Sequence, residues 1–388
     1  MTTMTPAYDL APLASIALVG ALLALLPVAW VWRRERGQGA PARLHALTVL
    51  ALCLTFDLVL FGAFTRLTDS GLGCPDWPGC YGSASPLGAH AQIGAAQSLL
   101  PEGPVTHAKA WVEMIHRYLA TGVGALIVVL VVLSWVEARR RTLTISPWWA
   151  SATLVWICLQ GAFGALTVTM KLYPLIVTLH LLGGMVLLVL LAVQTQASKR
   201  ARLAMPRGLY IATLVLAALS AVQIALGGWV STNYAVLACR EFPACQGSWW
   251  PAMDFEHGFA LLRELGVGHD GGALPFAALT AIHYVHRLVA YIVLVAMALF
   301  AWRLFASGIP ALRPWAAGTA AIALWQLASG LSNVVLGWPL IGAVAHTAGA
   351  AAWVTLLAML ITRAREAAGA AMAMSPQGSP TRSWQPAP

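Results

Sequence analysis

The chain has 388 residues, of which 59% are hydrophobic and only 10% are Asp, Glu, Lys or Arg. Soluble globular proteins carry about a quarter charged residues, so this chain has too little polar surface to cover a water-facing globule. Its mean hydropathy of +0.75 and its long apolar runs indicate a polytopic membrane protein. The composition excludes soluble enzymes, disordered scaffolds and small secreted disulfide domains.

The net charge of +9 arises from short basic clusters that separate the apolar runs. The clusters contain Arg33, Arg34, Arg36 and Arg43; Arg139, Arg140 and Arg141; Lys199, Arg200, Arg202 and Arg207; Arg303 and Arg313; and Arg363 and Arg365. Basic segments of this kind hold loops on the cytoplasmic side of a membrane. The charge therefore reports topology and indicates no nucleic acid partner.

Apolar runs of about 20 residues predict nine membrane-spanning helices. They lie near 10–32, 44–67, 110–136, 148–169, 175–196, 208–230, 278–302, 314–336 and 341–362. Alternating sides along the chain places every basic cluster on one face of the membrane, with the N-terminus outside and the C-terminus in the cytoplasm. We expect a plasma membrane location, an uncleaved first helix within 1–43, and a disordered tail at 363–388.

An internal repeat relates the two halves of the chain. Cys74 and Cys80 recur 165 residues later as Cys239 and Cys245. Further matched pairs follow in the same order: Gly62 and Gly227, His116 and His286, Gly161 and Gly330, and His180 and His346. Four spans per repeat give both halves the same orientation, as parallel repeats. The sequence thus predicts an all-α membrane protein with four-helix bundles at 44–200 and 201–362, plus one extra N-terminal helix.

Four repeated histidines lie near the outer ends of their predicted spans: His116, His180, His286 and His346. A lone histidine in an apolar helix is usually a hydrogen-bonded core residue, but ionisable groups repeated in membrane helices point to function. Two imidazoles facing each other across a bundle are typical of a haem iron held from both sides. A zinc site would lack further ligands at suitable spacing, and proton-relay histidines of a transporter are the remaining alternative.

Arg117 and Arg287 follow two of these histidines directly and are candidate partners for haem propionates. Alternatively, each side chain extends to the membrane interface. Glu113 lies one helical turn before His116, and the second repeat has no carboxylate at the matching position. The first half is therefore the better candidate for chemistry and the second for electron storage. Alternatively, Glu113 only interacts favourably with the dipole at the start of its helix.

The repeated cysteines form two pairs on the predicted outer face, where disulfides are permitted. We expect bonds between Cys74 and Cys80 and between Cys239 and Cys245. Their spacing does not separate a structural disulfide from a redox-active one.

The run at 62–82, the Glu-x-x-His-Arg box at 113–117 and the duplicated histidine pairs resemble the haem A synthase family, in its bacterial form with a cysteine pair in each of two outer loops. Members convert haem O to haem A for terminal oxidases, by oxidising the C8 methyl through an alcohol to a formyl group. The resemblance implies that His116 and His180 flank the substrate haem and that His286 and His346 ligate haem b. Glu113 would be the essential acid.

This resemblance also implies membrane lipid, haem O synthase and an electron acceptor as partners, and it leaves a homo-oligomer open. The helix at 10–32 and the long outer loops at 83–107 and 252–277 depart from the family pattern. Two other functions fit the same histidines: a di-haem cytochrome b-type electron carrier, and a repeat-built transporter.

Overall fold

The computed structural model describes residues 11–140, 145–199 and 202–374, and no β-strand occurs among them. The long helices are α1 (Ala11–Arg34), α2 (Ala40–Leu67), α4 (His107–Arg139), α5 (Trp148–Thr169), α6 (Pro174–Lys199), α7 (Arg207–Thr232), α9 (Phe276–Ala306), α10 (Arg313–Val335) and α11 (Leu340–Met374). Every predicted span is a helix, and the ends lie close to those expected except at α11, which continues beyond the predicted end at 362 to Met374. The all-α fold class is confirmed.

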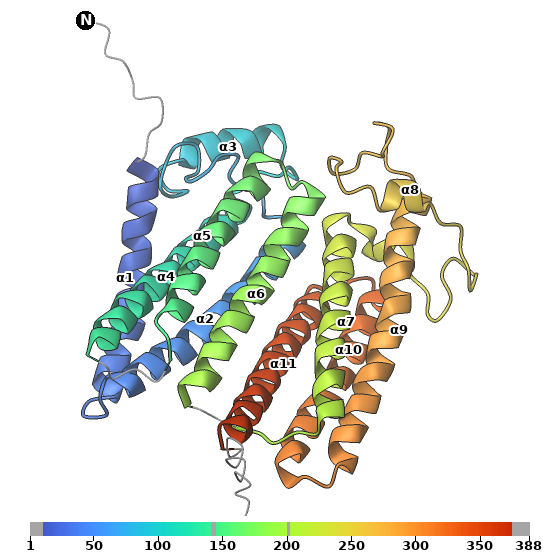
Figure 1. Ribbon diagram of the computed structural model, residues 1–388. Coiled ribbons are helices and arrows are strands. Elements are labelled where there is room, and N and C mark those ends of the chain that lie inside the picture. The colour runs from blue at the N-terminus through green and yellow to red at the C-terminus, as the bar shows by residue number, and fades with distance from the viewer. Residues whose placement is uncertain (1–10, 141–144, 200–201, 375–388) are drawn as a thin grey trace, which may run out of the picture.

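Eight helices in the described part of the chain are long and apolar enough to cross a membrane, and α10 is not among them. Its second half carries polar side chains, which lower its hydropathy: Gln326, Ser329, Ser332 and Asn333. It nevertheless packs along both α9 and α11 (Figure 1). The ninth predicted span is thus a more polar helix, whose polar side chains contact α11. The orientation of the termini stays a prediction.

The helices form two groups that follow one another in the chain and lie side by side (Figure 1). The first contains α2, α4, α5 and α6, and the second contains α7, α9, α10 and α11 in the corresponding order. Each group has its own apolar core, centred on Leu126 and Leu188 in the first and on Met297 and Leu360 in the second. The halves meet where α6 packs on α7 and α11, and where α11 packs on α2.

The extra helix α1 packs along α4 and also touches α2. A Cβ atom added at Gly20 would lie 2.5 Å from Cγ2 of Thr121, so glycine is needed for this close approach. On α4 the contact includes Gly122, whereas the matching residue 170 positions later on α9 is Ile292, which is 59% exposed. A small residue thus accommodates α1 in the first half, and a large apolar residue faces outward in the second.

The two ends of the molecule differ in character. The basic ends of α1, α4, α6 and α9 lie together at one end, and the cysteine loops lie at the other with α3 (His90–Leu99), η1 (Ala235–Ala238) and α8 (Phe255–Gly258) (Figure 1). A further short helix, η2 (Pro310–Leu312), precedes α10. This separation agrees with the predicted clustering of basic loops on one face.

The expected disorder from residue 363 onward is wrong for its first part. Helix α11 continues to Met374, because this segment is rich in alanine, the strongest helix former. Residues 375–388 of the predicted tail lie outside the described residues.

Candidate functional site

The first histidine of each half lies against a glycine of a neighbouring helix. His116 on α4 approaches Gly62 on α2 so closely that an added Cβ would lie 3.1 Å from Nε2. His286 on α9 has the same relation to Gly227 on α7, where the added Cβ would lie 3.0 Å from Cε1. A methyl group at either position would press on the imidazole, so glycine gives each ring its place inside the bundle.

The second histidine of each half also faces a glycine, and here the predicted match needs correction. His346 on α11 faces Gly330 on α10, at 3.2 Å from the built Cβ. His180 on α6 faces Gly164 on α5 at 3.5 Å, whereas Gly161 has no such neighbour within 4 Å. Gly164 and Gly330 are 166 residues apart, as His180 and His346 are. The structural counterpart of Gly330 is therefore Gly164.

The fold brings the histidines together in the two expected pairs. His116 lies close enough to His180 for an electrostatic interaction, and His286 has the same relation to His346. Nδ1 of His180 is buried and lacks a hydrogen-bond partner. Among the described residues, no group of three or more His, Cys, Asp or Glu side chains could hold a metal ion. Two facing imidazoles can supply both axial ligands of a haem iron.

Both predicted disulfides are confirmed, since Cys74 is bonded to Cys80 and Cys239 to Cys245. Each disulfide loop is anchored by the arginine that follows the first histidine of its half. Nη1 of Arg117 donates to the carbonyl oxygens of Asp76, Pro78 and Gly79, at 3.2, 3.1 and 2.5 Å. Nη1 of Arg287 donates to those of Glu241, Pro243 and Ala244, at 2.9, 3.3 and 3.0 Å.

Each carbonyl that Nη1 of Arg117 contacts precedes its counterpart at Arg287 by 165 residues. The two Nη1 groups therefore contact equivalent positions of the two loops. The sequence analysis missed this role of Arg117 and Arg287. The repeated loop, together with an arginine after each repeated histidine, was the signal that could have revealed it. Contact of either arginine with a haem propionate stays a prediction.

Glu113 is 4% exposed and joins the disulfide loop to α4. Its Oε2 accepts a hydrogen bond of 2.8 Å from the backbone N–H of Cys74, and its Oε1 lies 2.5 Å from Nη2 of Arg117. The matching residue of the second half is His283, whose Nδ1 lies 3.1 Å from the carbonyl oxygen of Ala235. A buried carboxylate thus belongs to the first half alone, and its contacts go beyond an interaction with the helix dipole.

Two polar side chains that the sequence analysis did not assign contact the second histidine pair. Nε2 of Gln223 on α7 lies 3.0 Å from Nδ1 of His286, and Oγ of Ser329 on α10 lies 3.0 Å from Nδ1 of His346. Both residues occur in apolar spans and lack a polar counterpart in the first repeat. That difference between the repeats was the available signal.

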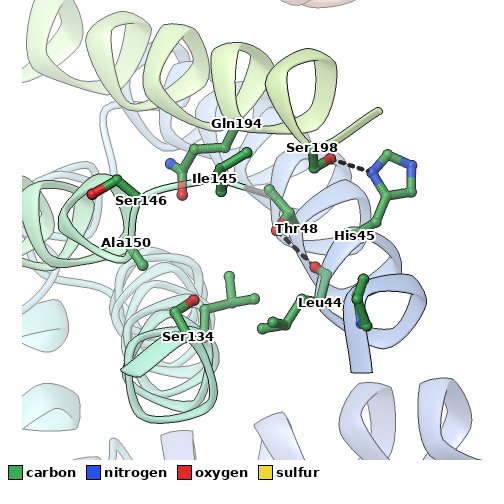
Figure 2. Close-up of a pocket in the computed structure, with 11 residues that line it drawn as sticks. Leu44, His45, Thr48, Ser134, Ile145, Ser146, Ala150, Gln194 and Ser198 are labelled. Atoms are coloured by element: carbon green, nitrogen blue, oxygen red, sulfur yellow. Dashed lines mark hydrogen bonds between the residues drawn. The ribbon is translucent and has the colours of Figure 1, made fainter. Parts of the chain in front are cut away.

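A small cavity lies at the basic end of the first half, away from the two repeated histidine pairs. It is lined by residues of α2, α4, α6 and the start of α5, and Figure 2 shows His45 bonded to Ser198 at its edge. Thr48 in its wall precedes Gly62 by 14 residues on α2, which is roughly 21 Å along a helix. Its volume of about 20 Å³ suits a water molecule. It is therefore not the histidine site.

Comparison with known proteins identifies the family. The model of a family described as cytochrome oxidase assembly protein matches residues 45–359. The chain belongs to this family. The matched region contains both histidine pairs and both disulfide loops, and it leaves out α1.

Several relatives in this family carry the name heme A synthase. One from Shewanella oneidensis is 38% identical over 81% of this chain and 93% of its own length. Others, from Methylobacterium radiotolerans and Methylorubrum extorquens, are 29% and 30% identical over 83% and 88% of this chain, and over 89% and 91% of their own lengths. The resemblance expected from the sequence is confirmed along most of the chain.

Proposed function

We propose that this multi-pass membrane protein is a haem A synthase, which takes haem O as its substrate and forms haem A. The observation that carries this proposal is a duplicated pair of facing histidines with a buried carboxylate in one copy only. The names of its relatives point to the same activity. Two equal haem sites would suit an electron carrier, but an acid present beside only one of them favours a site that performs chemistry on its haem.

His116 and His180 would flank haem O in the first half, and His286 and His346 would hold haem b in the second. The glycines opposite all four rings support this assignment, because each leaves an imidazole free of pressure from a neighbouring helix. The apolar helix walls of each half would enclose the rest of the macrocycle. When bound, haem b would supply a place to which electrons from the substrate can pass.

Glu113 would handle protons during the oxidation. If water supplies the oxygen atom and an electron acceptor takes two electrons in each step, converting the methyl group to an alcohol and then to a formyl group releases two protons per step. A buried carboxylate beside the substrate is suited to accept them. Arg117 would hold Glu113 in place through their ion pair. The link from Glu113 to Cys74 would fix the outer loop over the first half. Glu113 would thus connect the substrate site with the disulfide loop that lies over it.

Pigment analysis tests the proposal. The full-length protein is purified from cells that also make haem O, and its haems are extracted and identified by chromatography and mass spectrometry. We expect haem b together with haem O or haem A. Haem b alone, in two copies per chain, would instead identify a di-haem electron carrier, and a colourless protein from haem-replete cells would contradict both functions.

A further inference from the structure

Hydrogen bonding to the histidine rings differs between the two halves. In the second half both rings have a side-chain partner at Nδ1: Gln223 for His286 and Ser329 for His346, each at 3.0 Å. In the first half the corresponding positions are occupied by Leu58 and Phe163. Neither of these side chains can form a hydrogen bond, so the repeat provides its own internal comparison.

The first-half histidines accordingly lack such partners. Nδ1 of His180 is buried without a hydrogen bond; this ring has a hydrogen bond to the backbone of Gln160, a residue that the second half repeats as Gln326. Within the described part of the chain, the ring of His116 has no hydrogen-bonded side chain and stacks on Phe61, with 6.2 Å between ring centres. Side-chain hydrogen bonds therefore do not hold these two rings in one orientation.

The Ser329 contact also determines which ring nitrogen of His346 carries the proton. The Ser329 hydroxyl donates its own hydrogen to the carbonyl oxygen of Trp325 at 2.7 Å. Its oxygen is then left to accept a hydrogen bond from Nδ1–H of His346. The lone pair of His346 is thereby placed on Nε2. A histidine prepared in this way is a ready metal ligand.

Gln223 can do the same for His286. Its Oε1 is buried and has no hydrogen-bond partner. A half-turn of the amide exchanges the positions of its nitrogen and oxygen. Oε1 would then face Nδ1 of His286 and accept its hydrogen, at the cost of the 3.2 Å contact from Nε2 to the His286 carbonyl oxygen. Nε2 of Gln223 also lies 3.4 Å from Nε2 of His286. With the amide turned, Nδ1–H of both second-half rings would be hydrogen-bonded, which leaves the lone pair of each ring on Nε2.

We infer that Gln223 and Ser329 are positioning residues that make the second half release its haem slowly. Leu58 and Phe163, at the same positions of the first half, leave that half free to exchange its haem. This inference rests on the proposed function, which requires one resident haem and one haem that enters and leaves. A partner that fixes a ligand ring typically changes metal affinity by 10- to 100-fold. The first half can release haem A more easily when the histidines that bind its iron are not held by such hydrogen bonds.

Haem transfer tests the inference. Purified full-length protein carrying haem b is mixed with excess apomyoglobin, and the transfer of haem b is followed by its absorption. We expect Gln223→Leu and Ser329→Ala each to release haem b about 10-fold faster than the unchanged protein, with altered low-spin electron paramagnetic resonance signals. The matched control is Ser332→Ala on the same helix, because the Ser332 hydroxyl donates to the Ser329 carbonyl and not to a ring.

A reciprocal variant keeps the test decisive if these proteins fold poorly. Leu58→Gln introduces an amide beside His116 and should slow release of haem O from the first half by a similar factor. Unchanged release in Gln223→Leu, Ser329→Ala and Leu58→Gln would overturn the inference, even if His286→Ala still removes haem b. If His286→Ala and His346→Ala both retain haem b, the assignment of haem b to the second half, on which this inference rests, is wrong.

Discussion

Nη2 of Arg66 donates a hydrogen bond of 2.7 Å to the carbonyl oxygen of Ser231, the residue that takes the place of Arg66 in the second repeat. Asp69 and Tyr234 are also equivalent, 165 residues apart, and Oδ1 of Asp69 accepts a 2.7 Å hydrogen bond from the Tyr234 hydroxyl. Equivalent positions can meet only close to the axis that relates the repeats. The axis therefore passes between the ends of α2 and α7 that lie next to the cysteine loops, where these contacts join the halves.

Removing the Tyr234 hydroxyl should weaken this junction. Tyr234→Phe loses the hydrogen bond to Asp69 and leaves the ring over the Arg66 guanidinium in place. We expect a loss of about 1 kcal/mol in the free energy of unfolding, measured by thermal or denaturant unfolding in detergent. Tyr210→Phe on α7 is the control, since the Tyr210 hydroxyl has no hydrogen bond to the residues that the structure describes. An equal loss in both variants would assign the effect to the ring environment and not to the junction.

The same tyrosine predicts a pH dependence. Burial raises the pKa of Tyr234 above its ordinary value of 10.0, and Arg66 opposes this shift. The folded state therefore binds the phenolic proton more tightly than the unfolded state, so this stabilisation is fully present below pH 10 and is lost as the pH rises through the folded pKa. Above pH 10, the unchanged protein should lose stability more steeply than Tyr234→Phe. Parallel pH profiles would contradict this.

Neutralising Glu113 should separate chemistry from haem binding. Glu113→Gln keeps an oxygen that can accept from the Cys74 N–H but loses the charge paired with Arg117. We expect haem A formation to fall roughly 100-fold or more, while the haem b spectrum is unchanged. The control is Glu137→Gln, a buried carboxylate at the opposite end of the same helix. Normal haem A formation in Glu113→Gln would remove this residue from the catalytic site.

The histidine pairs should lose different haems when they are changed. His286→Ala and His346→Ala should abolish the low-spin haem b signal in optical and electron paramagnetic resonance spectra, because one axial ligand is removed. His116→Ala and His180→Ala should keep that signal and lose haem A formation. If the first-half variants also lose the low-spin haem b signal, the assignment of haem b to the second half is wrong.

Weakening the arginine anchor should expose the disulfide loop. Arg287→Lys cannot reproduce the planar set of donors that contacts four loop carbonyls. We expect the loop to open more often and the Cys239–Cys245 bond to be reduced by an added thiol about 10-fold faster, a change that corresponds to about 1.4 kcal/mol. Alkylation and mass spectrometry measure this rate. Arg313→Lys, at the basic end, should leave it unchanged, and equal rates in all three proteins would contradict the anchoring role.

The spans and the repeat could be predicted because each depends on a pattern that the chain displays directly. Long apolar runs fix helix positions to within a few residues, and two cysteine pairs with equal spacing reveal the duplication. The match of Gly161 with Gly330 was wrong because α5 contains glycines at 161 and 164. A spacing that varies between 165 and 170 residues allows either. Only packing against His180 shows that Gly164 is the counterpart.

Contacts between distant segments could not be predicted in this way. The sequence places Arg117 beside His116, but its bonds to carbonyls near residue 78 depend on how the outer loop folds back over α4. Gln223 was visible as a polar residue in an apolar span, yet its neighbour His286 is 63 residues away. Such roles follow from helix packing, which periodicity alone does not determine.

The position of α1 restricts how a bulky, lipid-dissolved porphyrin can approach the first half sideways. Because α1 lies along α4 and touches α2, it covers the groove between those two helices. On α5, away from α1, Val155 and Leu159 face outward with 63% and 47% of their surfaces exposed. We therefore expect a porphyrin that moves within the bilayer to reach and leave the first half on the α5 side, because α1 covers the side formed by α2 and α4.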